Sequence, residues 1–255
     1  MTTFIIAEIG SNHNGRLDRA CWLIREAAHA GASAAKFQLW TAEDITPSEN
    51  YPLARRFELP PEWLPKLKEE CDTCSIEFMC TPFSTDAVEI LTPLVQRWKI
   101  ASYDVGKQEM VNTIIETGKP VIVSDGRSTW SKIRLLLPDA SILHCVSQYP
   151  APVSGILSGL DFKHAYSGFS DHTLSTTLPS VAVGMGASII EKHLTLQRPD
   201  DGPDHGHSLV PLEFERMVCN IREVELAVYG QPVPTPPRPD RLEWVLDDAA
   251  ATRRS

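Results

Sequence analysis

The sequence lacks long apolar runs and any excess of basic residues. No run reaches the 18 or so apolar residues of a membrane-spanning helix, and the N-terminal MTTFIIAEIGSNHNG lacks the basic and apolar segments of a secretory signal. We therefore expect no membrane association. Lys and Arg number 24 against 33 Asp and Glu, a net charge of −9. This balance argues against nucleic-acid binding, which needs a basic face, but it leaves room for a local cationic pocket.

Cysteine is also scarce, with six residues scattered through a chain of 255. Such spacing is too sparse for a disulfide scaffold, and it predicts a reducing, cytoplasmic location. The length suits a single α/β barrel, which typically takes ~250 residues.

Short apolar runs alternate with longer amphipathic stretches. Runs of this length are typical of buried parallel strands. The eight predicted strands are Phe4–Glu8, Ala34–Leu39, Ile76–Cys80, Trp98–Ala101, Val121–Ser124, Ser141–Cys145, Tyr166–Phe169 and Ser188–Glu191. The predicted helices between or after them are Leu17–Ala30, Glu62–Cys74, Thr85–Leu94, Lys107–Thr117, Leu174–Met185 and Pro211–Val228. The connection 151–165 contains Pro and Gly, which limits it to at most a short helix.

Strands that each lead into a crossover form one parallel sheet. Polar residues gather at the C-terminal ends of nearly all the predicted strands, which favours a closed (β/α)8 TIM barrel over a doubly wound open sheet. We predict an α/β fold of one domain, a catalytic barrel over residues 1–230. The segment 231–255 begins with QPVPTPPRPDR and is predicted to be a proline-rich C-terminal tail.

One group of strand-end residues combines cations with hydroxyls. Lysines inside a barrel are costly unless an anion neutralises them. Phosphate or carboxylate is the natural ligand, although any one lysine can instead pair with a neighbouring acid. The group comprises Lys36, Lys99 and Lys192 with Thr81, Ser102, Ser124 and Ser170.

A second group contains His172 and His193, at the ends of adjacent predicted strands, with three acids nearby: Glu8, Glu191 and Asp204. Two imidazoles so placed suit a divalent metal with open positions, although each histidine can also serve as a simple hydrogen-bonding residue. Asn12 and His13, in the loop after the first strand, are further candidates for ligand contact. The run Asp204-His205-Gly206-His207 is either a metal tract or an active-site loop, and we favour the loop.

Taken together, the motifs resemble the sialic acid synthase family, phosphoenolpyruvate-dependent condensing enzymes that make nonulosonic acids. The resemblance spans nearly all of residues 4–229. It rests on AEIGSNHNG (7–15), KFQ (36–38), TPFS (81–84), KIAS (99–102), GKPVIVSDG (118–126), LHCVSQYPAP (143–152), GFSDHT (168–173), EKHLT (191–195) and GPDHGHSL (202–209).

The resemblance implies that phosphoenolpyruvate condenses with a sugar or sugar-like aldehyde, such as an amino sugar, to give a 2-keto-3-deoxy acid and phosphate. It implies a divalent metal, Mn²⁺ before Mg²⁺ or Co²⁺, on His172 and His193. Catalytic roles fall on Glu8, Glu191, Lys192 and Asp204. Phosphoenolpyruvate is assigned to Lys36, Thr81, Lys99, Ser102, Ser124 and Ser170, and Gln38 and Tyr149 are placed with Glu8 and Asp204 near the acceptor.

Three departures from the family pattern bear on these expectations. Family members usually continue into a small antifreeze-like domain, which caps the partner's barrel in a domain-swapped dimer, and no such segment follows the barrel here. A homo-oligomer nevertheless remains compatible with the resemblance. Ser147 stands where Asn is usual near phosphoenolpyruvate. Asp125 and Arg127 are also unusual, and they either retune the pocket or pair with each other.

Two other functions remain open from the residues. One is a Schiff-base aldolase on the same barrel, with Lys99 or Lys192 as the nucleophilic amine, because burial lowers the pKa of a lysine. The other is a barrel that binds phosphoenolpyruvate or a sugar without turnover.

Overall fold

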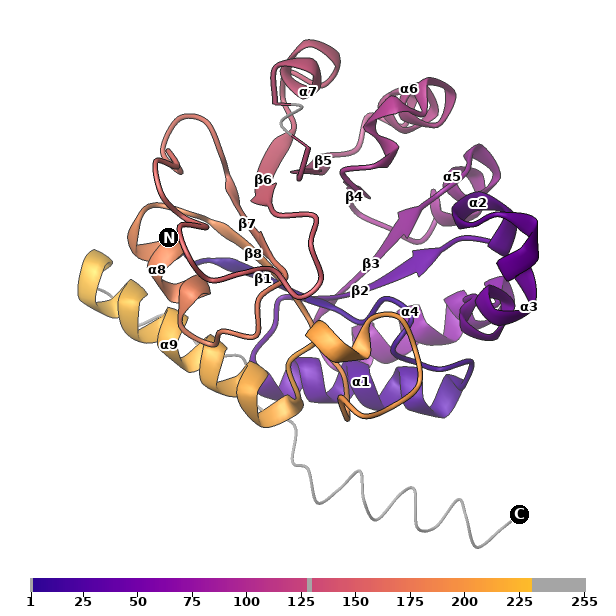
Figure 1. Cartoon of the computed structure of the whole chain (residues 1–255), viewed down its shortest axis with the longest axis horizontal. Helices are drawn as coiled ribbons and strands as arrows, with labels where there is room; N and C mark the ends of the chain where they lie inside the picture. Colours follow the sequence, from indigo (N-terminus) through magenta and orange to yellow (C-terminus); the bar gives the residue numbers. More distant parts are fainter. Residues whose placement is uncertain (1, 128–129, 231–255) are drawn as a thin grey trace, which may run out of the picture.

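A computed structural model describes residues 2–127 and 130–230, so the predicted tail at 231–255 lies outside the described residues. Within the described part, eight parallel strands with helices between them form a (β/α)8 TIM barrel (Figure 1). The strands are β1 (Phe4–Glu8), β2 (Ala34–Leu39), β3 (Glu77–Pro82), β4 (Trp98–Ile100), β5 (Val121–Asp125), β6 (Ser141–Cys145), β7 (Gly168–Asp171) and β8 (Ile189–His193).

The sheet is nearly closed. Its order is β3-β2-β1-β8-β7-β6-β5-β4, so the first strand pairs with both the second and the last. The two ends of this order, β3 and β4, contact each other and bring the sheet round into a barrel. The predicted fold class is therefore confirmed, and the strand ends converge on one mouth.

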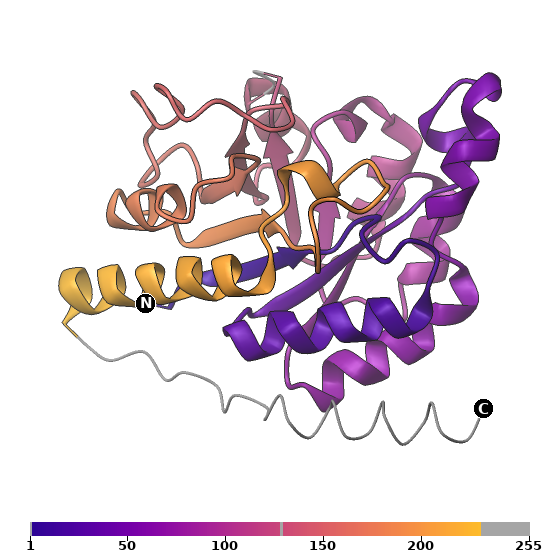
Figure 2. The same cartoon turned by 60° about the horizontal axis from the view of Figure 1, so that its bottom comes forward.

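Helices cover the outside of the sheet. Their bounds are α1 (Leu17–Ala30), α2 (Ala42–Ile45), α3 (Tyr51–Ala54), α4 (Leu64–Thr73), α5 (Thr85–Leu91), α6 (Gln108–Glu116), α7 (Trp130–Leu136), α8 (Leu178–Gly184) and α9 (Pro211–Tyr229). The long final helix packs against α8 and α1 (Figure 2). Among the described helices, none combines the length and apolar character needed to cross a membrane.

The predicted elements match the observed ones closely. β1, β2, β6 and α1 have the predicted bounds, and α1 ends at Gly31, whose φ of +90° suits glycine. Four strands run further than predicted: β3 to Pro82, β5 to Asp125, β7 to Asp171 and β8 to His193. Ladder hydrogen bonds join backbone groups, so polar side chains at a strand end do not stop the strand. The connection 151–165 has no helix, and the sequence did not predict α2, α3 and α7.

The barrel interior consists of an apolar floor and a polar layer above it. The floor is the buried cluster Ile6, Ala34, Met79, Ile122, Leu143 and Ile189. Side chains two residues further along a strand point to the same side, so each floor residue is followed by one in the next layer. These are Glu8, Lys36, Thr81, Ser124, Cys145 and Glu191, all buried. The apolar floor therefore closes the barrel beneath a polar pocket.

Candidate functional site

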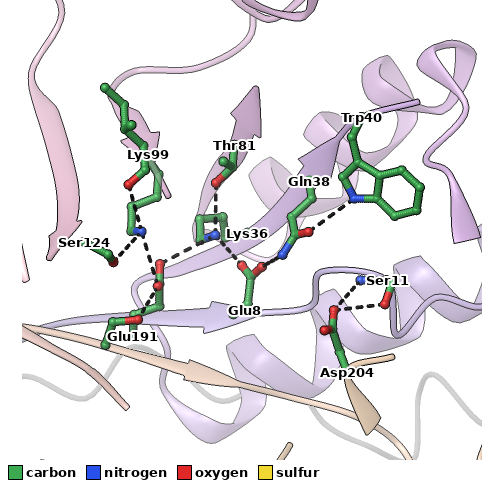
Figure 3. A network of polar contacts seen from close by, with 12 residues as sticks. Glu8, Ser11, Lys36, Gln38, Trp40, Thr81, Lys99, Ser124, Glu191 and Asp204 are labelled. Carbon is green, nitrogen blue, oxygen red and sulfur yellow. Dashed lines mark hydrogen bonds and ion pairs between the residues drawn. The ribbon is translucent and has the colours of Figure 1, made fainter. Parts of the chain in front are cut away.

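Lys36 lies at the centre of the polar layer. Its Nζ is 2.6 Å from Glu8 Oε2 and donates a 3.1 Å hydrogen bond to the Thr81 hydroxyl (Figure 3). Glu191 Oε2 is a further 3.6 Å contact. Gln38 Nε2 donates to the other Glu8 oxygen at 2.5 Å, so two side chains of the neighbouring strand β2 hold the two oxygens of this carboxylate.

Lys99 forms the second cationic centre of the pocket. Its Nζ donates to the Ser124 hydroxyl at 2.8 Å and lies 3.5 Å from Glu191 Oε1. The Ser170 hydroxyl donates to the same Glu191 oxygen at 2.7 Å. Glu191 therefore bridges both lysines. Each lysine is paired with a neighbouring acid, which is the alternative to an anionic ligand that the sequence allows.

The two acids have opposite protonation tendencies. Burial raises the pKa of Glu8 to about 7; Glu191 adds to the rise, while Lys36 opposes it. Burial would also raise the pKa of Glu191, but the two lysines and the Ser170 hydroxyl outweigh it and lower the pKa to about 2. One carboxyl can therefore exchange a proton near neutral pH while the other stays charged.

The pocket is a cavity of about 80 Å³ in the polar layer. It is lined by every residue that the resemblance assigns to phosphoenolpyruvate: Lys36, Thr81, Lys99, Ser102, Ser124 and Ser170. Gln38, Tyr149 and both predicted metal-binding histidines also line it, together with Glu8 and Glu191. Ser147 lies just behind, 3.3 Å from the Ser102 hydroxyl and from the Gly126 carbonyl oxygen.

His172 and His193 lie next to each other at one side of the pocket, with ring centroids 5.7 Å apart. His172 Nδ1 is 2.8 Å from the Val146 carbonyl, which leaves Nε2 facing the interior near Ser170. His193 Nδ1 is buried with no hydrogen-bond partner among the described residues. Burial lowers the pKa of His172 to about 4 and holds that of His193 well below its usual value, so both rings are neutral, as metal ligands must be. The donor set therefore fits a divalent metal.

Asp204 is held at the rim by the loop that follows β1. Its Oδ2 accepts from the Ser11 backbone N–H at 3.1 Å and from the Ser11 hydroxyl at 2.9 Å. Gly10 makes this approach possible, because a Cβ there would lie 2.5 Å from Asp204 Oδ2, and its φ is +51°.

Lys192 is not at the pocket, contrary to its predicted catalytic role. It is fully buried on the opposite side of β8 from Glu191, and its Nζ lies 2.6 Å from Asp171 Oδ2. Its ammonium group also donates to the Thr173 carbonyl. Adjacent residues of a strand point to opposite faces, so this lysine joins β8 to β7 and its loop outside the barrel.

Asn12 and His13, predicted to contact substrate, instead organise the loop. Asn12 Nδ2 donates to the Leu194 carbonyl and to the Ser208 hydroxyl, both at 2.9 Å. His13 Nδ1 accepts from the Gly15 N–H, and its ring packs edge-on against Trp63. Neither side chain lines the pocket.

Asp125 and Arg127, both within the described residues, each contact a different tyrosine and do not pair with each other. Asp125 accepts a 3.1 Å hydrogen bond from the Tyr166 hydroxyl. The Arg127 guanidinium lies over the Tyr103 ring, 4.8 Å from its centroid. Asp125 alternates with the inward-facing Ser124, so its charge points away from the anion pocket.

Two further side chains contribute to the site: Trp40, which the sequence did not indicate, and His207, which the sequence placed only in a candidate metal tract or active-site loop. Trp40 Nε1 donates to Gln38 Oε1 at 3.2 Å and orients the amide that holds Glu8. His207 lies beside His193, with ring centroids 4.5 Å apart. The DHGH run at 204–207 indicated that His207 could bind a ligand. Its distance from His193 could not be obtained from the sequence, because the two residues lie in a loop and in a strand.

Comparisons with known proteins show the family to which the chain belongs. A model of the NeuB family matches residues 23–232, and the chain belongs to that family. It is 40% identical to an uncharacterized protein of Methanocaldococcus jannaschii, covering 93% of this chain and 76% of that protein. It is 33% identical to the N,N'-diacetyllegionaminic acid synthase of Legionella pneumophila, covering 88% of this chain and 73% of that enzyme.

Among solved structures, the N-acetylneuraminic acid synthetase of Leptospira borgpetersenii superposes with a TM-score of 0.82 and 30% identity, covering 100% of this chain and 94% of that one. The Bacillus subtilis spore coat polysaccharide biosynthesis protein SpsE gives a TM-score of 0.73 and 33% identity, covering 93% and 72%. These matches confirm the family resemblance seen in the motifs.

Proposed function

We propose that this protein condenses phosphoenolpyruvate with a sugar or sugar-like aldehyde, giving a 2-keto-3-deoxy acid of the nonulosonic type and releasing phosphate. The observation that carries the proposal is the pocket itself, in which two buried lysines and four hydroxyls lie beside a pair of neutral histidines. Membership of the NeuB family and relatives named as synthases of such acids support it.

Phosphoenolpyruvate carries a phosphate and a carboxylate, and Lys36 and Lys99 offer one cation to each end of such a dianion. Glu8 and Glu191 form ion pairs with these lysines. A bound anion replaces part of that pairing, and the hydroxyls of Thr81 and Ser124 already point at the ammonium groups it would approach.

In the reaction, C3 of phosphoenolpyruvate forms a bond to the aldehyde carbon. Water then adds at C2, and phosphate leaves with cleavage of its C–O bond. A divalent ion on His172 and His193, Mn²⁺ before Mg²⁺ or Co²⁺, would supply Lewis-acid polarisation of the aldehyde oxygen. Glu8 is suited to take the proton of the attacking water, because its pKa of about 7 lets it act as a base at neutral pH. The lysines stabilise the negative charge on the departing phosphate.

The direct test is release of phosphate from phosphoenolpyruvate by purified protein with Mn²⁺ against a panel of free and phosphorylated amino sugars. The His172→Ala/His193→Ala variant should release none. Binding of phosphoenolpyruvate without turnover on any aldehyde would instead favour a non-catalytic barrel.

One observation keeps a Schiff-base aldolase as the second candidate. Burial and the neighbouring Lys36 lower the pKa of Lys99, although Glu191 opposes the shift. A lysine amine of lowered pKa is a better nucleophile. Borohydride treatment in the presence of a keto acid should leave Lys99 unmodified under our proposal, whereas a trapped adduct would favour the aldolase.

We also propose a cytoplasmic setting, which the six free cysteines suit.

A further inference from the structure

Two histidine rings lie close together beside the pocket. His193 Nδ1 and His207 Nε2 are both buried and have no hydrogen-bond partner among the described residues. Their rings are nearly perpendicular, with centroids 4.5 Å apart. Burying an imidazole nitrogen without a hydrogen-bond partner lowers the stability of the fold. Two such nitrogens on neighbouring rings therefore indicate a ligand that both rings share.

A carboxylate completes the group. Asp204 Oδ1 lies 3.9 Å from His207 Nε2, and one donor atom from each of His193, Asp204 and His207 lies within 4.8 Å of the others. Ser11 donates two hydrogen bonds to the other Asp204 oxygen, Oδ2. These bonds fix the orientation of the carboxylate and therefore the direction in which Oδ1 points. Donors bound to one ion at about 2.1 Å are roughly 3.0–3.4 Å apart, so side-chain shifts of roughly 1 Å would bring the group around a metal.

His172 borders the same space. Its ring centroid is 6.4 Å from that of His207 and 5.7 Å from that of His193. Tyr149 packs against His172 and His207, with centroid distances of 4.3 and 4.8 Å. Three imidazoles, from the residue after β7, from β8 and from the loop after β8, therefore surround one volume that Tyr149 partly covers.

We propose that His207 is a third imidazole ligand of the metal ion and that Asp204 is its carboxylate ligand, so that the ion is held by three nitrogens and one oxygen. This inference rests on the proposed function for what the ion does, but not for whether it binds. It changes the expected role of Asp204, which binds the ion through one oxygen while Ser11 orients the other.

The ligand chemistry predicts which ion the site selects. Three neutral imidazoles favour the later divalent ions, whereas Mg²⁺ prefers sites of oxygen donors and water. A site with only two histidine ligands, whose other coordination positions are open to water, discriminates less between Mg²⁺ and the later divalent ions. We therefore expect Co²⁺ to bind at one ion per chain and a hundredfold excess of Mg²⁺ to leave it bound.

The experiment is titration of the metal-free protein with Co²⁺ alone, without substrate, followed by calorimetry and visible absorption. His207→Gln keeps a polar side chain but removes the ligand nitrogen, and it should weaken Co²⁺ by at least about tenfold and shift the absorption bands. His207→Asp supplies a different donor and should recover part of the affinity. His144→Gln is the matched control: His144 Nε2 is also buried without a partner among the described residues, but the ring stacks against Phe169, away from the cluster. It should bind Co²⁺ like the unaltered protein.

Unchanged affinity and spectrum in His207→Gln would overturn this inference alone, because Co²⁺ would still be bound by His172 and His193. Failure of the unaltered protein to bind Co²⁺ would overturn both this inference and the metal dependence in the proposed function. Circular dichroism of the metal-free variants checks that each is folded. Equal melting temperatures in the absence of metal, with different Co²⁺ binding, assign the effect to ligation.

Discussion

Lys36 Nζ lies 2.6 Å from Glu8 Oε2, and both groups are buried inside the barrel. The two residues face each other across the register that pairs β1 with β2. The pocket thus carries its own counter-ion. An incoming dianion must compete with an internal carboxylate whose pKa of about 7 lets it become neutral near physiological pH.

The first prediction concerns the cations. Lys36→Met should raise the dissociation constant of phosphoenolpyruvate by about 10- to 150-fold, because a hydrogen bond to a charged group contributes about 1.5–3 kcal/mol. Thr81→Val removes a neutral partner of the same lysine and should cost only about 2- to 12-fold. Calorimetric titration measures both. Equal losses in the two variants would show that charge is not what binds the ligand.

The second prediction concerns pH. Burial raises the pKa of Glu8 to about 7, so the fraction able to accept a proton falls as the pH drops below 7. We expect kcat/KM to fall by about tenfold per pH unit on the acid side of that value. Burial lowers the pKa of His172 to about 4, so this histidine stays neutral through the same range. In Glu8→Gln, the remaining activity should lose this acid limb; an unchanged limb would assign it to another group.

The third prediction tests the placement of Lys192. Its ammonium group is fully buried against Asp171, so Lys192→Met leaves a buried carboxylate unpaired and should lower the free energy of unfolding by about 3–5 kcal/mol. Phosphoenolpyruvate affinity below the melting temperature should not change, because this lysine does not line the pocket.

Lys68→Met is the matched control, because Lys68 forms a salt bridge in contact with solvent with Asp72, one helical turn away. It should change the free energy of unfolding by less than about 1 kcal/mol. Loss of phosphoenolpyruvate binding in a folded Lys192→Met variant would show that Lys192 takes part in ligand binding after all.

The fourth prediction uses two glycines with similar backbones. Gly10 has φ +51° and Gly118 has φ +66°, so an alanine at either position should cost about 1–2 kcal/mol of backbone strain. Only at Gly10 does the new Cβ meet Asp204, whereas at Gly118 nothing lies within 4 Å. Steady-state kinetics should show the acceptor KM raised, by up to about 100-fold, in Gly10→Ala alone. A similar change in Gly118→Ala would mean that the effect is general destabilisation.

Much of the architecture follows from short-range patterns. The apolar run Phe4–Glu8 and the helix Leu17–Ala30 with its terminal glycine have the predicted bounds, because burial and capping act locally. The predicted phosphoenolpyruvate residues lie around one cavity, because each lies in a barrel strand or in the loop just after it, with its side chain lining the polar pocket.

The differences between the expected and the observed positions of these side chains have equally specific causes. Glu191 and Lys192 were both assigned to the site, although neighbours in a strand cannot both face the interior. Strand alternation alone would have separated them. The contact between His207 and His193 could not be predicted in this way, because it depends on how the loop after β8 folds back over the mouth.

The most direct test of the central claim follows the bridging oxygen of phosphoenolpyruvate. Substrate labelled with ¹⁸O between C2 and phosphorus is incubated with the protein, a divalent metal and an accepted aldehyde, and the released phosphate is analysed by mass spectrometry. Condensation with C–O cleavage predicts that the label leaves with phosphate in equal amount to the keto acid formed. Unlabelled phosphate would mean cleavage at phosphorus and would contradict the proposed synthase reaction.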